Sequence, residues 1–333
     1  MKMTRTGSTV LVSLLIALSF ENGQVVSGAL VAGQSRPLST TSPQAPRLRF
    51  EKVSDHVHFL QLREDGANVT AVSAESGILL VNPPADPDLQ PVLEAVKRVA
   101  ARPIRWVVST DYMMERSGGS AILQNQGAAL LASSELRRLA AAGPEQAGEA
   151  GPRISFTRQM RLFPENLEIR IIAVQHRART AGDVLLFIPA EKVLVTGDLF
   201  VGGSFPEIDQ SVGEGSALGW IDGLKQAIDA VPLLKSAMPQ PKPDPSKPQP
   251  EEKTLEEQVT VIPGRGPRSD LREMKDLLEA ALKLRAELAK AIGSGRSRDS
   301  ALSSSALGPA RSLGNFESFA SRLFDDLAAR HAK

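Results

Sequence analysis

The residues best suited to chemistry lie in one short stretch, residues 109–119, where acidic, basic and hydroxyl side chains stand close together. A largely apolar run at 104–108 precedes the stretch and is typical of a buried β-strand. Residues 121–123 are typical of the start of a helix. A polar loop between a strand and a helix is where α/β proteins commonly build active sites. The sequence therefore predicts a functional loop at this junction.

Nucleophilic catalysis is not predicted for this loop. Ser109, Thr110 and Ser117 supply hydroxyls, but such a nucleophile needs a base within hydrogen-bond reach, and no histidine stands near them. The chain has no cysteine, so thiolate chemistry is excluded. We expect its four histidines at strand ends or on the surface: His56, His58, His176 and His331.

The composition excludes several classes of function. Of 333 residues, 42% are hydrophobic and 23% are charged, as in ordinary globular proteins. A formal net charge of +1 gives no electrostatic case for binding nucleic acid or an anionic membrane surface. Aromatic residues make up only 4%, which argues against base stacking. Because there is no disulfide, the core must supply the stability.

The N-terminus has the pattern of a secretory signal peptide. Lys2 and Arg5 precede an apolar segment at 10–18, and small residues follow at 27–29. We expect a signal peptide over 1–29, a flexible lead-in over 30–46 and a bacterial protein that is periplasmic or secreted, without a membrane span after cleavage. An uncleaved anchor is the alternative, although the apolar segment is short for a membrane helix.

Alternating apolar residues predict a first sheet of hairpin-connected strands, antiparallel to mixed. Its strands are expected over 50–53, 57–62, 68–74 and 78–81. Apolar spacing predicts a helix over 88–101, and the segment after the functional loop is expected to contain a helix at 121–126, a strand at 128–132, a helix at 135–141 capped by Ser134, and a surface loop at 143–152.

A second sheet and a helical tail follow. The sheet is expected to contain strands over 158–162, 167–173, 184–188 and 192–196; a helix over 219–231 and a final strand over 258–262 are expected after them. A segment rich in Pro, Lys and Glu, 239–257, is expected to be a disordered insertion. Helices over 270–292 and 316–329, separated by a Gly/Ser-rich break, complete the chain, so we expect a folded domain at 47–268 and a C-terminal helical extension at 269–333.

Five motifs resemble, in order, those of the metallo-β-lactamase superfamily. Residues 109–119 resemble its loop S/N-T-H-x-H-x-D-H-x-G-G. The others are 77–82 for G-x-x-L-V-D with Asn82 at the acid, 179–183 for H-T-x-G-D, 196–200 for T-G-D-L-F and 263–267 for P-G-H-G-P. The resemblance covers about 57–267 and implies an α/β fold, an αββα sandwich of two mixed β-sheets flanked by helices. The helical tail resembles that of one exported subgroup.

The resemblance also implies where the family's metal pocket would lie. Its seven positions hold Asp111, Met113, Glu115, Arg116, Arg179, Asp198 and Arg265. Only Asp198 keeps the family's identity, and no histidine remains. Arginine is permanently protonated and cannot bind zinc, so we expect no zinc and no other cofactor.

The charges at these positions balance, with three acids and three arginines. We expect a salt-bridge cluster, with Met113 as an apolar filler, to join the loops that metals join in the family. Two alternatives remain for the pocket. A calcium or magnesium site would require each arginine to turn away from the acids. The arginines could instead bind an anionic small molecule, and His176, three residues before Arg179, is the candidate general base.

We therefore expect a pseudoenzyme: an exported metallo-β-lactamase-like protein without catalytic activity, with a binding or structural role and a small anionic ligand or a protein partner. The alternative, which the resemblance favours, is a divergent hydrolase of ester, lactam or thioester substrates. A third hypothesis is a partner-binding protein that uses the insertion or the C-terminal helices. In that case, deleting 239–257 would abolish partner capture and spare small-molecule binding.

Overall fold

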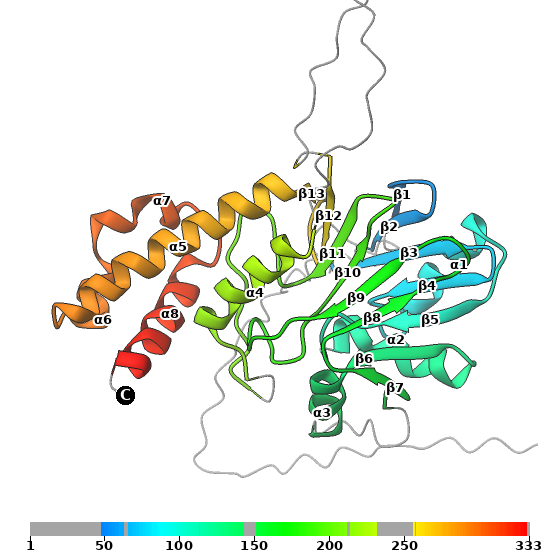
Figure 1. The fold of residues 1–333 in the computed structure, drawn as a ribbon, viewed down its shortest axis with the longest axis horizontal. Helices are drawn as coiled ribbons and strands as arrows, with labels where there is room; N and C mark the ends of the chain where they lie inside the picture. The colour runs from blue at the N-terminus through cyan, green and yellow to red at the C-terminus, as the bar shows by residue number, and fades with distance from the viewer. Residues whose placement is uncertain are drawn as a thin grey trace, which may run out of the picture. The chain divides into compact units, whose positions relative to one another are not determined.

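Two β-sheets packed face to face organise the fold (Figure 1). The computed structural model describes residues 48–62, 66–112, 114–142, 151–211, 214–231, 256 and 258–331. Within these residues, seven strands form the first sheet in chain order, antiparallel from β1 to β4 and parallel from β4 to β7. They are β1 (Arg49–Lys52), β2 (Val57–Gln61), β3 (Asn68–Ala74), β4 (Gly77–Val81), β5 (Ile104–Val108), β6 (Ala129–Ser133) and β7 (Ile154–Phe156).

The second sheet is also mixed. Its order is β13-β12-β11-β10-β9-β8 across the described strands, and only β11 and β12 in it are parallel. The strands are β8 (Gln159–Leu162), β9 (Ile169–Ala173), β10 (Val184–Ile188), β11 (Val193–Gly197), β12 (Thr260–Pro263) and β13 (Ser269–Asp270). The predicted sandwich of two mixed sheets is confirmed.

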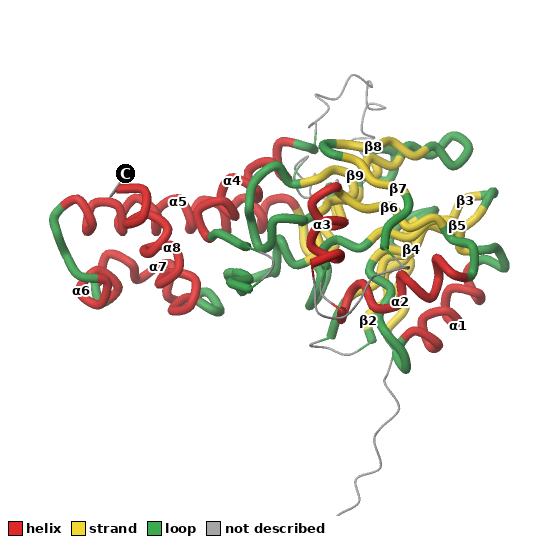
Figure 2. The backbone as a smooth tube through the Cα atoms, turned by 90° about the horizontal axis from the view of Figure 1, so that it is seen from below, coloured by secondary structure: helices red, strands yellow, loops and turns green. Residues whose placement is uncertain are grey.

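Helices cover the outer faces of both sheets (Figure 2). The helices α1 (Leu89–Val99), α2 (Met114–Asn125) and α3 (Ser134–Ala142) belong to the first half of the chain. The second half contributes α4 (Ala217–Asp229), α5 (Leu271–Gly293), α6 (Arg298–Leu302), a 3-10 turn (Ser305–Leu307), α7 (Gly308–Arg311) and α8 (Phe316–His331).

The second sheet is covered on both faces, by the first sheet on one side and by helices on the other, as strand β10 shows. Its side chains alternate between two apolar cores, because successive residues of a strand point to opposite faces. Val184, Leu186 and Ile188 face the first sheet, whereas Leu185 and Phe187 pack in the core beneath α4, α5 and α8. A third core lies between the first sheet and α1, whose residues Leu89, Val92 and Val96 recur at helical spacing.

The C-terminal helices share their core with the second sheet. Phe319 of α8 stacks on Phe205 with ring centroids 4.4 Å apart, and it meets Trp220 of α4 edge-on at 4.9 Å. The Trp220 indole N–H donates to the backbone carbonyl of Leu199, 2.7 Å away, just after β11. The predicted tail helices are therefore present and packed as part of the sandwich.

Helix α2 corrects the sequence prediction most clearly, because it begins at Met114 rather than at 121. Gly118 and Gly119 lie within it rather than in a loop. A Cβ on Gly119 would lie 2.4 Å from the carbonyl oxygen of Pro84, and a Cβ on Gly118 would lie 2.5 Å from the Ala85 Cβ. The glycines are therefore needed for close helix packing, and they do not end the helix.

Smaller predictions were also wrong. Ser133, not Ser134, caps α3, since its hydroxyl accepts from the Leu136 N–H at 3.0 Å. The short strands β7 and β13 were not predicted, and the presumed break after α5 contains α6. The predicted signal peptide, lead-in and nearly all of the insertion lie outside the described residues. No helix among the described residues combines the length and apolarity needed to cross a membrane.

Candidate functional site

The predicted site residues meet where strands of both sheets end. Asp111 follows β5 of the first sheet, while Asp198 and Arg265 follow β11 and β12 of the second. Arg179 lies in the loop between β9 and β10. Parallel neighbouring strands end at the same edge of a sheet, which brings their following loops together.

A buried guanidinium joins the two sheets at this edge. Arg179 Nη1 lies 3.3 Å from Asp111 Oδ2, and its Nη2 lies 3.7 Å from Asp198 Oδ2. All three residues are at most 4% exposed. Arg265 approaches Asp198 from the solvent side, with Nε 2.9 Å from Oδ2 and a side chain that is 40% exposed. Two arginines thus neutralise the carboxylates of Asp111 and Asp198.

The loop after β5 is held by Asn82. Its Oδ1 accepts from the Thr110 N–H at 2.8 Å and from the Thr110 hydroxyl at 3.1 Å. Asn82 has a φ of +57°, a left-handed conformation that asparagine tolerates better than most residues. The Thr110 carbonyl accepts from the Val184 N–H at 2.8 Å. Asp111 is therefore positioned by contacts with both sheets.

The loop after β12 is held by Asn68 at the start of β3. The Asn68 N–H donates to the Gly264 carbonyl at 2.8 Å, and Nδ2 donates to the carbonyls of Pro263 and Gly266, each at 2.9 Å. A Cβ on Gly264 would lie 2.1 Å from Asp198 Oδ1, so only glycine allows this approach. These contacts place Arg265 against Asp198.

Asp183 is a second buried acid beside the cluster. Its carboxylate accepts from the Thr180 N–H at 2.9 Å and from the Thr180 hydroxyl at 2.7 Å. The pKa of Asp183 is raised to about 7, mainly by burial and to a lesser extent by the negative charge of Asp111, against the lowering effect of the hydrogen bonds from Thr180 and of Arg179. Asp183 is therefore a buried carboxyl group whose pKa lies well above the usual range for aspartate.

A polar segment covers the outer side of Arg179. The Tyr112 hydroxyl donates to the Asp209 carboxylate and lies 3.2 Å from the Ser211 hydroxyl. The Asp209 N–H donates to the Arg179 carbonyl at 3.0 Å. A cavity of about 410 Å³ lies between Arg179 and residues 207–211. The cluster is thus shielded by a loop tied to both Tyr112 and Arg179.

Four of the seven predicted site residues come together in this cluster: Asp111, Arg179, Asp198 and Arg265. The backbones of Glu115 and Arg116 lie in α2, but their side chains, like all of Met113, lie outside the description. The candidate general base His176 is exposed and lines a different cavity, beside Ser133 and Arg138. Its position does not support a role in the cluster.

Sequence analysis missed two residues that build the site. Asp183 ends the motif R-T-A-G-D, which supplied a signal, but its burial and proton could not be inferred from the motif. Asn82 was identified only as a residue that differs from the aspartate of the motif G-x-x-L-V-D. In the structure it positions Thr110.

Solved structures with the same arrangement of elements are metallo-β-lactamases. A metallo-β-lactamase from Pontibacter korlensis superposes with a TM-score of 0.54 and 17% identity over 71% of this chain and 99% of that one. VMB-1 gives a TM-score of 0.54 and 15% identity over 71% of this chain and 96% of its own. DIM-1 metallo-β-lactamase exposed to ceftazidime gives a TM-score of 0.51 and 17% identity over 72% of this chain and 99% of its own.

The chain therefore has the metallo-β-lactamase fold, with C-terminal helices added. At this level of identity the likeness shows the fold alone. No family profile matches the sequence. No curated protein matches it either.

The fold raises the question of whether these residues fit zinc. Zinc takes imidazole, thiolate or carboxylate ligands, and a guanidinium cannot serve as one. Here the Arg179 guanidinium lies against both buried carboxylates, and among the described side chains no group of three or more His, Cys, Asp or Glu is placed to hold a metal ion. The described donor set does not fit zinc.

Proposed function

We propose that this chain is a non-catalytic protein of metallo-β-lactamase fold, in which a buried ion-pair cluster replaces the metals. The observation that supports the proposal is the Arg179 guanidinium between the carboxylates of Asp111 and Asp198. The Arg179 guanidinium pairs with both acids and links the two sheets, as a bound metal would, and Arg265 supplies the second positive charge. The remaining role of the fold is then structural or in binding.

The metal content of the purified protein tests this proposal. The protein is expressed in zinc-supplemented medium, dialysed and analysed by atomic emission, and its thermal unfolding is followed with and without added zinc. We expect substoichiometric zinc, a cooperative transition and no zinc-dependent rise in melting temperature, since a ligand stabilises only the state that binds it. One or two tightly bound zinc ions per chain would overturn the proposal.

A divergent hydrolase is the second candidate, and the fold shared with metallo-β-lactamases favours it. Turnover of a chromogenic cephalosporin, a p-nitrophenyl ester and a thioester distinguishes the two. We expect no turnover above background. Activity that Asp198→Asn abolishes would favour the hydrolase.

Two further parts of the proposal concern binding and location. We propose a small anionic ligand for the cluster, because the Arg265 side chain is 40% exposed at its solvent side; a protein partner is the alternative. Titration with citrate and inorganic phosphate, with Arg265→Gln as the comparison, tests the anion. We also propose export, on the pattern of the N-terminal residues, which N-terminal sequencing of protein from the periplasm and the medium would check.

A further inference from the structure

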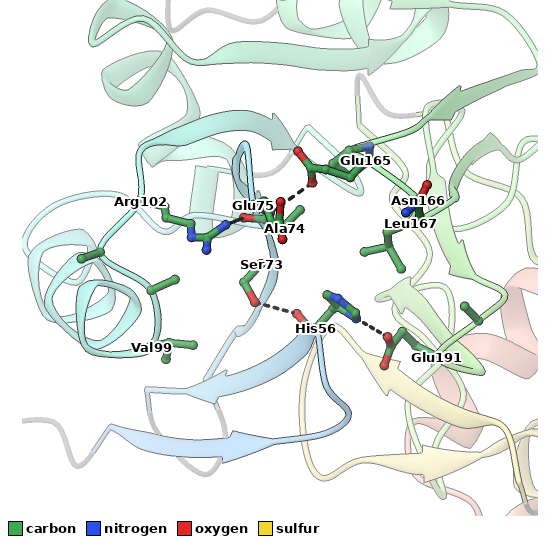
Figure 3. A pocket seen from close by; sticks show the side chains of 14 residues that line it. His56, Ser73, Ala74, Glu75, Val99, Arg102, Glu165, Asn166, Leu167 and Glu191 are labelled. Carbon is green, nitrogen blue, oxygen red and sulfur yellow. Dashed lines mark hydrogen bonds and ion pairs between the residues drawn. The ribbon is translucent and has the colours of Figure 1, made fainter.

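A second cavity lies at the opposite ends of the same strands. Strand β4 runs from this cavity to Asn82 at the cluster, and β11 runs from it to Asp198. The cavity has a volume of about 740 Å³, within the usual range for small-molecule sites. Five turns contribute to it, at His56, residues 73–75, 99–102, 164–167 and 190–191, so both sheets form its walls (Figure 3).

Polar contacts lock these turns to one another. The Glu165 carboxylate accepts from the backbone N–H groups of Glu75 and Ser76 at 3.0 and 2.8 Å, which ties the second sheet to the first. Arg102 Nη1 donates to the Ala74 carbonyl at 2.7 Å, and His56 Nδ1 contacts the Glu191 carboxylate (Figure 3). A cavity whose walls are fixed before binding loses less entropy when a ligand enters.

The backbone at Glu165 carries strain that serves this arrangement. Glu165 has a φ of +55°, a left-handed conformation that is unfavourable for a residue with a side chain. In this conformation its carboxylate accepts two hydrogen bonds from the turn between β3 and β4 of the first sheet. Strained residues held by their surroundings cluster at ligand sites, which supports a binding role for this cavity.

Two charges of opposite sign remain available in the walls. Within the described part of the chain, the Glu75 carboxylate takes part in no hydrogen bond or ion pair, whereas Glu165 and Glu191 are both engaged. Arg102 uses one of its five N–H donors, for the Ala74 carbonyl. Apolar side chains complete the lining, with Val99 half-buried and Leu167 buried.

We propose that this cavity binds a short zwitterionic peptide. Its carboxylate pairs with the Arg102 guanidinium, its ammonium group pairs with Glu75, and an apolar side chain contacts Val99 and Leu167. A simple anion matches the cavity less well, because Glu75 would repel it. The proposal concerns a site separate from the Asp111–Arg179 cluster and does not depend on the function proposed for that cluster.

Calorimetric titration of the full chain with the dipeptides Leu-Leu, Gly-Leu and Leu-Gly tests the proposal. We expect at least one to bind with a Kd below about 1 mM, and Arg102→Gln and Glu75→Gln each to weaken binding at least about tenfold. Arg137→Gln, an exposed arginine on α3 outside the cavity, serves as the matched control and should leave the Kd unchanged.

Capped peptides assign the two charges. N-acetylation removes the ammonium group, so the acetylated peptide should bind weakly and be insensitive to Glu75→Gln. C-terminal amidation removes the carboxylate, so the amide should be insensitive to Arg102→Gln. The proposal is overturned if no dipeptide binds at about 10 mM, or if both capped forms bind as tightly as the free peptide. Glu75 is exposed, and its carboxylate takes part in no hydrogen bond or ion pair among the residues that the structure describes, so Glu75→Gln keeps the test valid even if Arg102→Gln is unstable.

Discussion

Replacing Arg179 by methionine should destabilise the protein strongly. The change keeps most of the side-chain volume but removes the cation between Asp111 and Asp198, which are 1% and 4% exposed. Breaking a buried ion pair by removing one partner costs about 3–5 kcal/mol, because the remaining charge stays buried without compensation. Arg265 still contacts Asp198, so that carboxylate keeps a partner, and we expect a loss at the lower end of this range, about 3 kcal/mol.

The expected change in melting temperature follows from that value. In a domain of this size, 1 kcal/mol shifts the melting temperature by about 2–4 °C, which gives a decrease of about 10 °C. Arg177→Met is the matched control, two residues away. Its side chain is 65% exposed and pairs with Glu214 at 2.7 Å, and an exposed pair contributes at most about 1 kcal/mol.

A double variant separates charge from packing. In Arg179→Met, the further change Asp111→Asn removes one of the two negative charges that Arg179 paired and should restore about half of the lost stability. Differential scanning calorimetry at pH 7 measures all four proteins. The reasoning is refuted if Arg179→Met melts within the range of Arg177→Met, or if Asp111→Asn adds a further loss in the Arg179→Met background.

Three further predictions concern stability as measured by urea unfolding. Burial raises the pKa of Asp183 from 3.8 to about 7, so its contribution to stability is complete below pH 3.8 and is lost as the pH rises through about 7. Asp183→Asn should flatten the pH profile between these values, and an unchanged profile would contradict the assignment. Asn82→Ala should cost about 2–3 kcal/mol, because it removes the acceptor of two buried donors of Thr110, while Asn82→Asp should cost less; equal losses would argue against the hydrogen bonds. Phe319→Ala in α8 should cost about 4 kcal/mol with one cooperative transition, and a separate early transition would show that the tail unfolds alone.

Sequence patterns predicted the sheets well because alternation reports burial on the two faces of a strand. The strands β1 to β4 and β8 to β11 were placed within two residues of their observed bounds. β7 was missed because it has three residues, two of them exposed, and is defined by its pairing with β6. The start of α2 was misplaced because glycines that normally end helices here allow close packing against residues 84–85.

The candidate site was predictable where residue type alone fixes the chemistry. Arginine cannot bind zinc and must be paired when buried, so the contact of Arg179 with Asp111 and Asp198 follows from the motif order. The raised pKa of Asp183 could not be predicted, because it depends on burial among elements far apart in the chain. The cavity at the opposite ends of the strands could not be predicted either, since five separate turns form it.

The stacking of Phe319 on Phe205 has a consequence for the order of folding. A chain folds from its N-terminus as it is synthesised, and contacts between distant segments form last. The first sheet with α1 can collapse early, since its strands follow one another in the chain with only the helices α1 to α3 and loops between them. The core between the second sheet and the helices α4, α5 and α8 remains incomplete until α8, near the end of the chain, has been synthesised. The loop that carries Arg179 lies between β9 and β10, and both strands contribute to this core, so we expect the ion-pair cluster to be among the last parts of the protein to reach its final geometry.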